Sequence, residues 1–380
     1  MAETMIGAYG QWAASLRRGK LPEMSFRRDE FTDVDAWRPA ARQRVLDRLA
    51  GPEVPTPGSV ETIDVTELDG LRVERLRWRL PFGPPTDAVC LKPADATGRL
   101  PGVLALHCHG GRKCWGWKKV ARAGDVEPPV AAHHQQYYGG RPWANALARR
   151  GYVVLAHDLF AFASRRVRMA DCSPEVRVGE VVAPDPGDAE AVEAYDRFAL
   201  AHENIMAKSL LSAGTTWPGV FAAEDRAALG VLAGRDDVDA GRLGCGGLSG
   251  GGLRTCMLAG LDERIRCSVG VGFMTTWEDF LLAKCHTHTW MVYVPLLPNE
   301  LDFPEIVGLR APRPTMVMNT TEDALFSLDA VKESKAMLEQ VFAKAGAADR
   351  LAFNLYAGPH KFDVPMQDDA FAWFDRWLRE

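Results

Sequence analysis

Short apolar runs alternate with amphipathic stretches from residue 101 to the end of the chain, and this pattern constrains the fold more than any other feature. The apolar runs are continuous, which is typical of parallel strands buried on both faces. The stretches between them have helical spacing, so we predict an α/β fold, a mostly parallel sheet flanked by helices. The predicted strands are 102–109, 152–160, 242–248, 265–273, 314–320 and 351–358, and the predicted helices are 143–151, 222–234, 251–261, 328–346 and 368–378.

The chain before residue 101 has a different pattern. Three runs, at 61–68, 71–80 and 87–94, alternate between apolar and polar residues, which indicates antiparallel strands at the start of the sheet. Residues 1–60 are predicted to form an N-terminal helical extension, with a helix at 35–49 that the proline-rich GPEVPTPGS ends. Residues 61–380 are predicted to form one α/β domain. Its connections at about 161–217 and 274–313 are too long for simple crossovers, so we expect lid-like insertions there.

Composition and charge exclude several classes of protein. Of the 380 residues, 47% are hydrophobic and 25% are charged, which is ordinary for a soluble globular protein. The formal net charge is −5 and there is no long basic run, so we expect no nucleic-acid partner. No apolar run approaches the about 18 residues of a membrane span, and the first residues do not resemble a signal peptide. We therefore expect a cytoplasmic protein with no membrane association, whose eight scattered cysteines are reduced and mostly buried.

The sequence GLSGG at 247–251 matches the motif G-x-S-x-G, with Ser249 at its centre. It follows a predicted strand and precedes a predicted helix, as a nucleophile elbow does. A side chain two residues before or after the serine would clash in so tight a turn, and the helix N-terminus would help to stabilise an oxyanion. A dinucleotide-binding fingerprint starting at Gly244 is an alternative, but it lacks the third glycine, and Asp262 precedes a strand instead of ending one. The pattern favours Ser249 as a nucleophile over an incidental serine in a glycine-rich turn.

A serine nucleophile needs a base and an acid, which are expected after later strands in the order Ser, Asp or Glu, His. Asp323 follows the strand 314–320 and is the predicted acid, with the neighbouring Glu322 as the alternative. His360 follows the strand 351–358 and is the only histidine beyond residue 288, so it is the predicted base. Asp323 and His360, each taken singly, are more readily explained as a turn carboxylate and a solvated histidine. Taken together, Ser249, Asp323 and His360 match the expected nucleophile, acid and base in their order along the chain, their spacing and their placement after strands.

The loop HCHGGRK at 107–113 is expected to supply one backbone N–H of an oxyanion hole, and Gly250, which follows the serine, is expected to supply the other. With these motifs the chain resembles an α/β-hydrolase of the dienelactone-hydrolase and acetyl-xylan-esterase-like group. The resemblance covers about residues 35–380. It includes the tryptophan-bearing N-terminal helix, the H-x-H-G-G loop, the GLSGGG elbow, the NTTED turn and the GPHKF loop.

This resemblance implies that residues 61–380 form an α/β-hydrolase catalytic domain. The site residues that it implies are Ser249 as nucleophile, Asp323 as acid, His360 as base, and the backbone N–H groups of His109 and Gly250 as oxyanion hole. The chain departs from the group in two ways. Dienelactone hydrolases use a cysteine nucleophile, so serine here favours ordinary ester hydrolysis. The position of Cys108 is often glycine in such loops.

Histidine pairs offer an alternative chemistry, that of a metal-dependent hydrolase. Two histidines that alternate along a strand point to one face and can ligate zinc. The pairs are His107/His109, His133/His134 and His286/His288. No H-E-x-x-H motif and no acidic cluster accompany them, so no metal is expected.

Two further groups of residues leave alternatives open. The aromatic residues of the 274–313 insertion either form a substrate pocket above the serine or pack the insertion onto the domain; they are Trp277, Phe280, Trp290, Tyr293 and Phe303. Arg165 and Arg166 either recognise a carboxylate or are solvated, and we favour solvation.

Taken together, the residues and the resemblance predict a serine hydrolase. It would cleave a carboxylic ester of a small soluble substrate through an acyl-enzyme, with no cofactor. A peptidase or amidase on the same fold is an alternative, although a large gating domain like that of prolyl-oligopeptidase-like enzymes is absent. A binding protein that kept the fold and lost turnover is another, and the complete set of three residues argues against it. No motif specifies the acyl group, the alcohol or the oligomeric state.

Overall fold

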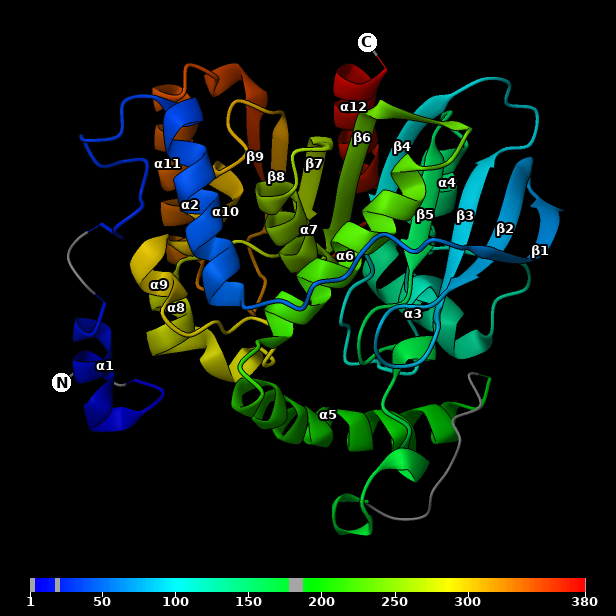
Figure 1. The fold of residues 1–380 in the computed structure, drawn as a ribbon, viewed down its shortest axis with the longest axis horizontal. Coiled ribbons are helices and arrows are strands. Elements are labelled where there is room, and N and C mark those ends of the chain that lie inside the picture. Colours follow the sequence, from blue (N-terminus) through cyan, green and yellow to red (C-terminus); the bar gives the residue numbers. More distant parts are fainter. Residues whose placement is uncertain (1–3, 18–20, 178–186, 380) are drawn as a thin grey trace.

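Nine strands form one mixed sheet within residues 4–17, 21–177 and 187–379, which are the residues that this computed structural model describes (Figure 1). Their order across the sheet is β1-β2-β3-β5-β4-β6-β7-β8-β9. The strands are β1 (Glu61–Leu68), β2 (Leu71–Trp78), β3 (Thr86–Pro93), β4 (Leu100–Ala105), β5 (Val153–His157), β6 (Val238–Leu248), β7 (Ile265–Val271), β8 (Thr315–Thr320) and β9 (Leu351–Tyr356).

The pairing of the strands changes once across the sheet, from antiparallel to parallel. Strands β1 to β3 pair antiparallel with one another, and β3 pairs antiparallel with β5. From β5 through β4 to β9 all pairs are parallel. Burial follows this change: β2 mixes buried with exposed positions, whereas every residue of β8 is buried. The predicted antiparallel start and parallel continuation of the sheet are therefore both confirmed.

Helices cover both faces of the sheet (Figure 1). Val317 of β8 belongs to a hydrophobic core that includes residues of α2, α6, α7 and α11. Its neighbours Met316 and Met318 belong to a second core, on the other face, that includes residues of α4 and α12, because successive side chains of a strand alternate. The helices are α1 (Gly10–Ser15), α2 (Val34–Leu49), α3 (Pro128–Tyr138), α4 (Trp143–Ala148), α5 (Ala189–Ser212), α6 (Trp217–Ala233), α7 (Gly250–Leu261), α8 (Trp277–Asp279), α9 (Leu297–Glu300), α10 (Phe303–Gly308), α11 (Leu328–Lys344) and α12 (Val364–Leu378). None of the described helices is both long and apolar enough to be a membrane-spanning segment.

The predicted insertion at 161–217 contains the long helix α5, which lies below the sheet in Figure 1. Residues 178–186 of this insertion lie outside the described residues. The side chain of Asp188 caps α5 by accepting hydrogen bonds from the N–H groups of Glu190 and Ala191. The buried face of α5, which includes Tyr195 and Phe198, packs on the segment after β4. The helix therefore covers the chain that leaves the sheet at the carboxyl end of β4.

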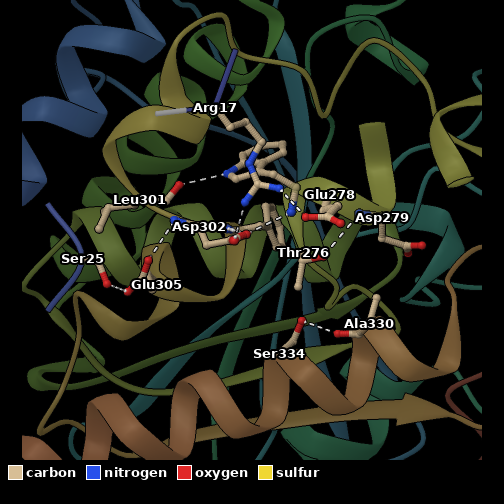
Figure 2. Close-up of polar contacts among 12 residues, drawn as sticks. Arg17, Ser25, Thr276, Glu278, Asp279, Leu301, Asp302, Glu305, Ala330 and Ser334 are labelled. Carbon is tan, nitrogen blue, oxygen red and sulfur yellow. Dashed lines mark hydrogen bonds and ion pairs between the residues drawn. The ribbon is translucent and has the colours of Figure 1, made fainter. Parts of the chain in front are cut away.

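The predicted insertion at 274–313 is tied to the N-terminal segment by polar contacts (Figure 2). Arg17 pairs with Glu278 at 3.2 Å and with Asp302 at 3.3 Å. Asp302 and Glu305 form a capping box at the start of α10, and Glu305 also accepts a hydrogen bond from Ser25. The N-terminal segment thus fixes the insertion to the domain.

The aromatic residues of this insertion mainly pack it onto the domain. Trp277, Phe280 and Phe303 are buried in the core that includes α2, α6 and α7. Trp290 is 39% exposed. Of the two alternatives, packing is therefore the one that these residues favour.

The prediction that the cysteines are reduced and mostly buried is confirmed. Six of the eight cysteines are buried, Cys172 and Cys285 are partly exposed, and all are free thiols, as predicted.

The prediction that Arg165 is solvated is wrong. Its side chain is buried, donates a hydrogen bond to the Phe82 carbonyl at 3.0 Å and pairs with Glu224 of α6, a carboxylate 59 residues along the chain.

Candidate active site

Ser249 occupies the sharp turn between β6 and α7. Its φ of 59° and ψ of −121° are strained for a non-glycine residue. A Cβ atom on Gly247 would lie 2.2 Å from the Leu106 carbonyl oxygen, and one on Gly251 would lie 2.1 Å from the same atom. Glycine is therefore required on both sides of the serine, as the motif predicts. The turn places Ser249 at the lining of a cavity at the carboxyl ends of the parallel strands.

His360 and Asp323 meet in the loops that follow β9 and β8. The distance from Nδ1 of His360 to Oδ2 of Asp323 is 2.5 Å. The other carboxylate oxygen of Asp323 accepts a hydrogen bond from the Leu325 N–H at 3.0 Å, which fixes the orientation of the carboxylate. Asp323 is 6% exposed, whereas Glu322 is exposed. The structure therefore brings Asp323, and not Glu322, to the imidazole.

The hydrogen bond to Asp323 leaves the other imidazole nitrogen of His360 as an acceptor. With Nδ1–H donating to the carboxylate, Nε2 carries the lone pair. Nε2 is buried and has no hydrogen-bond partner among the described residues. His360 lines the same cavity as Ser249. This arrangement suits a base that takes a proton from a nucleophile in the cavity.

The proposed oxyanion donors lie next to each other above the turn. Strand β4 ends at Ala105, so the predicted strand 102–109 is too long, and the chain from His107 onward is a loop. Gly110 and Gly111 of this loop both adopt positive φ, a conformation that glycine allows. A Cβ atom on Gly250 would lie 2.9 Å from the backbone nitrogen of His109. Within the described part of the chain we find no hydrogen bond from the N–H of His109 or of Gly250, so both N–H groups are free to bind an oxyanion.

Histidines of the pairs that suggested a metal-dependent hydrolase contact other side chains of the protein. His109 Nε2 lies 2.9 Å from Glu203 of α5, and burial lowers the pKa of His109 to about 4, so its side chain is neutral at pH 7. His107 packs against Phe162, and His133 packs against Tyr137. Among the residues that the structure describes, no group of three or more His, Cys, Asp or Glu side chains is arranged to hold a metal ion.

The cavity beside Ser249 has a volume of about 300 Å³. Its wall is formed partly by residues that the sequence analysis did not single out as site residues: Tyr137, Leu253, Phe273, Thr287, Thr289, Met291, Val292 and Leu325. His288, considered above only as half of a possible metal pair, also lines it. No Lys, Arg, Asp or Glu of the described residues is part of this lining. These residues come from five separate parts of the chain, namely α3, α7, the segment just after β7, the 274–313 insertion and the loop after β8, and no local motif marks them, because only the tertiary fold brings them together.

Comparisons with known proteins agree with this architecture. No protein-family model matches the chain. A protein of Bacillus subtilis (strain 168) named "Putative hydrolase YtaP" is 28% identical over 344 residues, which are 89% of this chain and 99% of that protein.

Solved structures with similar folds are named as esterases. A "putative acetyl xylan esterase" from Bacteroides fragilis NCTC 9343 superposes with a TM-score of 0.69 at 17% identity, covering 93% of this chain and 83% of that one. A glucuronoyl esterase from Solibacter usitatus has a TM-score of 0.59 at 16% identity, covering 91% of this chain and 94% of that one. The methylesterase BT1017 has a TM-score of 0.61 at 18% identity, covering 98% of this chain and 69% of that one. The chain has the α/β-hydrolase fold that these proteins share.

Proposed function

We propose that this protein is a serine esterase that cleaves carboxylic esters of small soluble substrates through an acyl-enzyme. The observation that carries the proposal is the strained turn at Ser249 in one cavity with His360, whose Nδ1 lies 2.5 Å from Asp323. Strain of this kind is retained where it positions a reactive group. The names of the solved structures with this fold, acetyl xylan esterase, methylesterase and glucuronoyl esterase, also support an ester as the substrate.

In the proposed first half-reaction, Oγ of Ser249 attacks the ester carbonyl carbon. Nε2 of His360 takes the hydroxyl proton as the new C–O bond forms. Asp323 holds the imidazole in the required tautomer and stabilises its positive charge. The carbonyl oxygen becomes an oxyanion, which the N–H groups of His109 and Gly250 stabilise. When this intermediate collapses, the bond to the alcohol breaks and the alcohol leaves with the proton from His360.

The second half-reaction releases the acid. A water molecule takes the place of the alcohol, and His360 removes its proton as it attacks the acyl carbonyl carbon. The oxyanion forms again in the same hole. Its collapse breaks the bond to Oγ, which recovers a proton from His360, and the carboxylic acid leaves.

The cavity lining suggests the chemical character of the group that binds beside Ser249. Its side chains include Leu253, Phe273, Met291 and Val292, with no described Lys, Arg, Asp or Glu. A charged group would lose its hydration there without a counter-ion, at a cost of several kcal/mol. We therefore propose that an uncharged group of modest size occupies this part of the site.

A panel of esters tests the proposed function. p-Nitrophenyl esters of increasing acyl length, acetylated sugars and lactones would be assayed with the wild-type protein and with Ser249→Ala. We expect hydrolysis of at least one neutral ester, and a loss of about 10⁴-fold or more in kcat for Ser249→Ala. Activity should survive dialysis against EDTA, because none of the proposed steps uses a metal.

Substantial turnover by a folded Ser249→Ala variant would contradict the proposed nucleophile. Loss of wild-type activity in EDTA, restored by zinc, would instead support the metal-dependent alternative. Circular dichroism of both proteins would show that the substitution has not unfolded the chain.

A further inference from the structure

Lys119 is a buried lysine directly behind the loop that carries His109. It ends the helical turn Trp117–Lys119 and its side chain is 0% exposed. Its Nζ donates hydrogen bonds to the carbonyl oxygens of Cys108 at 2.9 Å and of His109 at 2.8 Å. The ammonium also lies 4.6 Å from the centroid of the Phe162 ring. Burying an ammonium group costs desolvation free energy, and this one is used to hold two carbonyls of a single loop. A role in the function of that loop is therefore worth testing.

The charge of Lys119 is not cancelled by a carboxylate in contact with it. Among the described residues Lys119 forms no ion pair. Asp158 and Asp196 raise its pKa only through longer-range electrostatic attraction. The nearby Lys113 differs. It is also buried and lies 4.4 Å from the Phe162 centroid, but it forms an ion pair with Glu203 at 2.5 Å. Burial lowers the pKa of Lys119 to about 8, so the group is still mainly protonated at pH 7.

The hydrogen bonds of Lys119 determine where two N–H groups point. The carbonyl of Cys108 and the N–H of His109 belong to one peptide group, and in a trans peptide the two point in opposite directions. A carbonyl held toward Lys119 therefore directs the N–H of His109 away from it. The carbonyl of His109 and the N–H of Gly110 are related in the same way. The positive charge also polarises both peptide groups, which strengthens their N–H groups as donors.

We propose that Lys119 is a positioning residue for the oxyanion hole. Its ammonium holds and polarises the two peptide groups so that the N–H of His109 faces Gly250 and stabilises the oxyanion of the transition state. The proposal rests on the proposed esterase function. Because Lys119 acts through the backbone and does not reach the substrate, it affects transition-state binding more than substrate binding.

Paired substitutions of the two buried lysines test this role. Lys119→Met and Lys113→Met each remove one buried ammonium near Phe162, but only the first releases the carbonyls of the loop. We expect Lys119→Met to lower kcat by about 10- to 100-fold with KM changed by less than about threefold, since a lost oxyanion donor costs about 10²- to 10³-fold. Lys113→Met should keep kcat within about fivefold of wild type. Circular dichroism and urea unfolding would establish that both variants are folded at the assay temperature.

A transition-state analogue separates positioning from a general structural effect. A trifluoromethyl ketone accepts Oγ of Ser249 at its carbonyl carbon, His360 takes the proton, and the former carbonyl oxygen becomes an oxyanion in the hole. Its inhibition constant should rise in Lys119→Met by about the same factor as kcat/KM falls. Equal kcat losses in the two lysine variants, or a higher KM with unchanged kcat and inhibitor affinity, would overturn the proposal.

Lys119→Gln keeps the test decisive if the methionine variant does not fold. The amide retains N–H donors for the carbonyls but has no charge. A clear loss of kcat and of inhibitor affinity is again expected, and wild-type values for both would overturn the proposal. The assay distinguishes this failure from that of the proposed function, because wild type and Ser249→Ala are measured beside it. If the wild-type protein hydrolyses no ester, the proposed function fails. If it does and the lysine variants behave alike, only the role of Lys119 fails.

Discussion

The loops at the carboxyl edge of the sheet and the 274–313 insertion border the same cavity, but different interactions hold them in place. The loops follow strands directly, and Ser249 and His360 are fixed by a strained turn and by a 2.5 Å contact with Asp323. The insertion is held from outside the cavity. Glu305 at the start of α10 is 0% exposed and accepts hydrogen bonds from Ser25 and from Arg27 of the N-terminal segment, the latter at 3.0 Å.

This difference suggests a division of roles between the two regions. Changes in the loops should affect the rate of the chemical step, because they alter groups that meet the reacting atoms. Changes at the anchors of the insertion should affect stability and substrate binding, because they loosen a wall of the cavity. Two substitutions, one in each region, test this division.

The larger effect is expected in the loops, for Asp323→Asn. The amide keeps the shape of the carboxylate but cannot stabilise the imidazolium of His360, and it favours the wrong tautomer. We expect kcat to fall by about 10³- to 10⁴-fold. Glu322→Gln is the matched control, because this neighbouring carboxylate is exposed, and it should change kcat by less than about tenfold.

Steady-state kinetics on the best ester of the panel would compare the two variants. If Glu322→Gln lost more activity than Asp323→Asn, the acid would be Glu322 and the assignment would be wrong by one residue. If neither variant lost activity, the acid would lie elsewhere in the chain.

The smaller effect on catalysis is expected at the anchor of the insertion, for Glu305→Gln. This substitution weakens a buried, charge-assisted contact with Arg27, so the free energy of unfolding should fall by about 2–3 kcal/mol. We expect kcat to stay within about twofold and KM to rise by about two- to fivefold. Urea unfolding and steady-state kinetics measure these quantities.

Glu339→Gln is the control for this variant. Glu339 pairs with Lys335 at 3.8 Å on the surface of α11, with both side chains at least 40% exposed, and its loss should change stability by less than about 0.5 kcal/mol. A large drop in kcat with unchanged stability for Glu305→Gln would contradict the division of roles.

The sequence predicts the loops far better than the insertions, for a physical reason. Continuous apolar runs and glycine spacing are local signals, so the strands and the turn at Ser249 are readable from neighbouring residues. The placement of Asp323 beside His360 follows from parallel strands ending at one edge of the sheet. The end of β4 is predicted less well, because the apolar run continues through Leu106 after the chain has left the sheet.

Residues that depend on distant partners are not readable in this way. Arg165 was expected in solvent, but it is buried because Glu224 of α6 meets it. Met291 and Val292 of the cavity wall carry no motif, and their position depends on how the insertion packs. Lys119 is similar, since nothing in its neighbouring sequence indicates that it binds the carbonyls of Cys108 and His109.

The central claim is that Ser249 is an activated nucleophile, and reaction with a fluorophosphonate tests it most directly. Oγ of an activated serine attacks the phosphorus atom, fluoride leaves, and the proton passes to the base. We predict one adduct per chain by intact-mass spectrometry, mapped to the peptide that contains Ser249, with loss of ester hydrolysis in proportion to labelling. Ser249→Ala should acquire no adduct under the same conditions. An unlabelled wild-type protein that hydrolyses esters, or an adduct on another residue that forms equally in Ser249→Ala, would contradict the account.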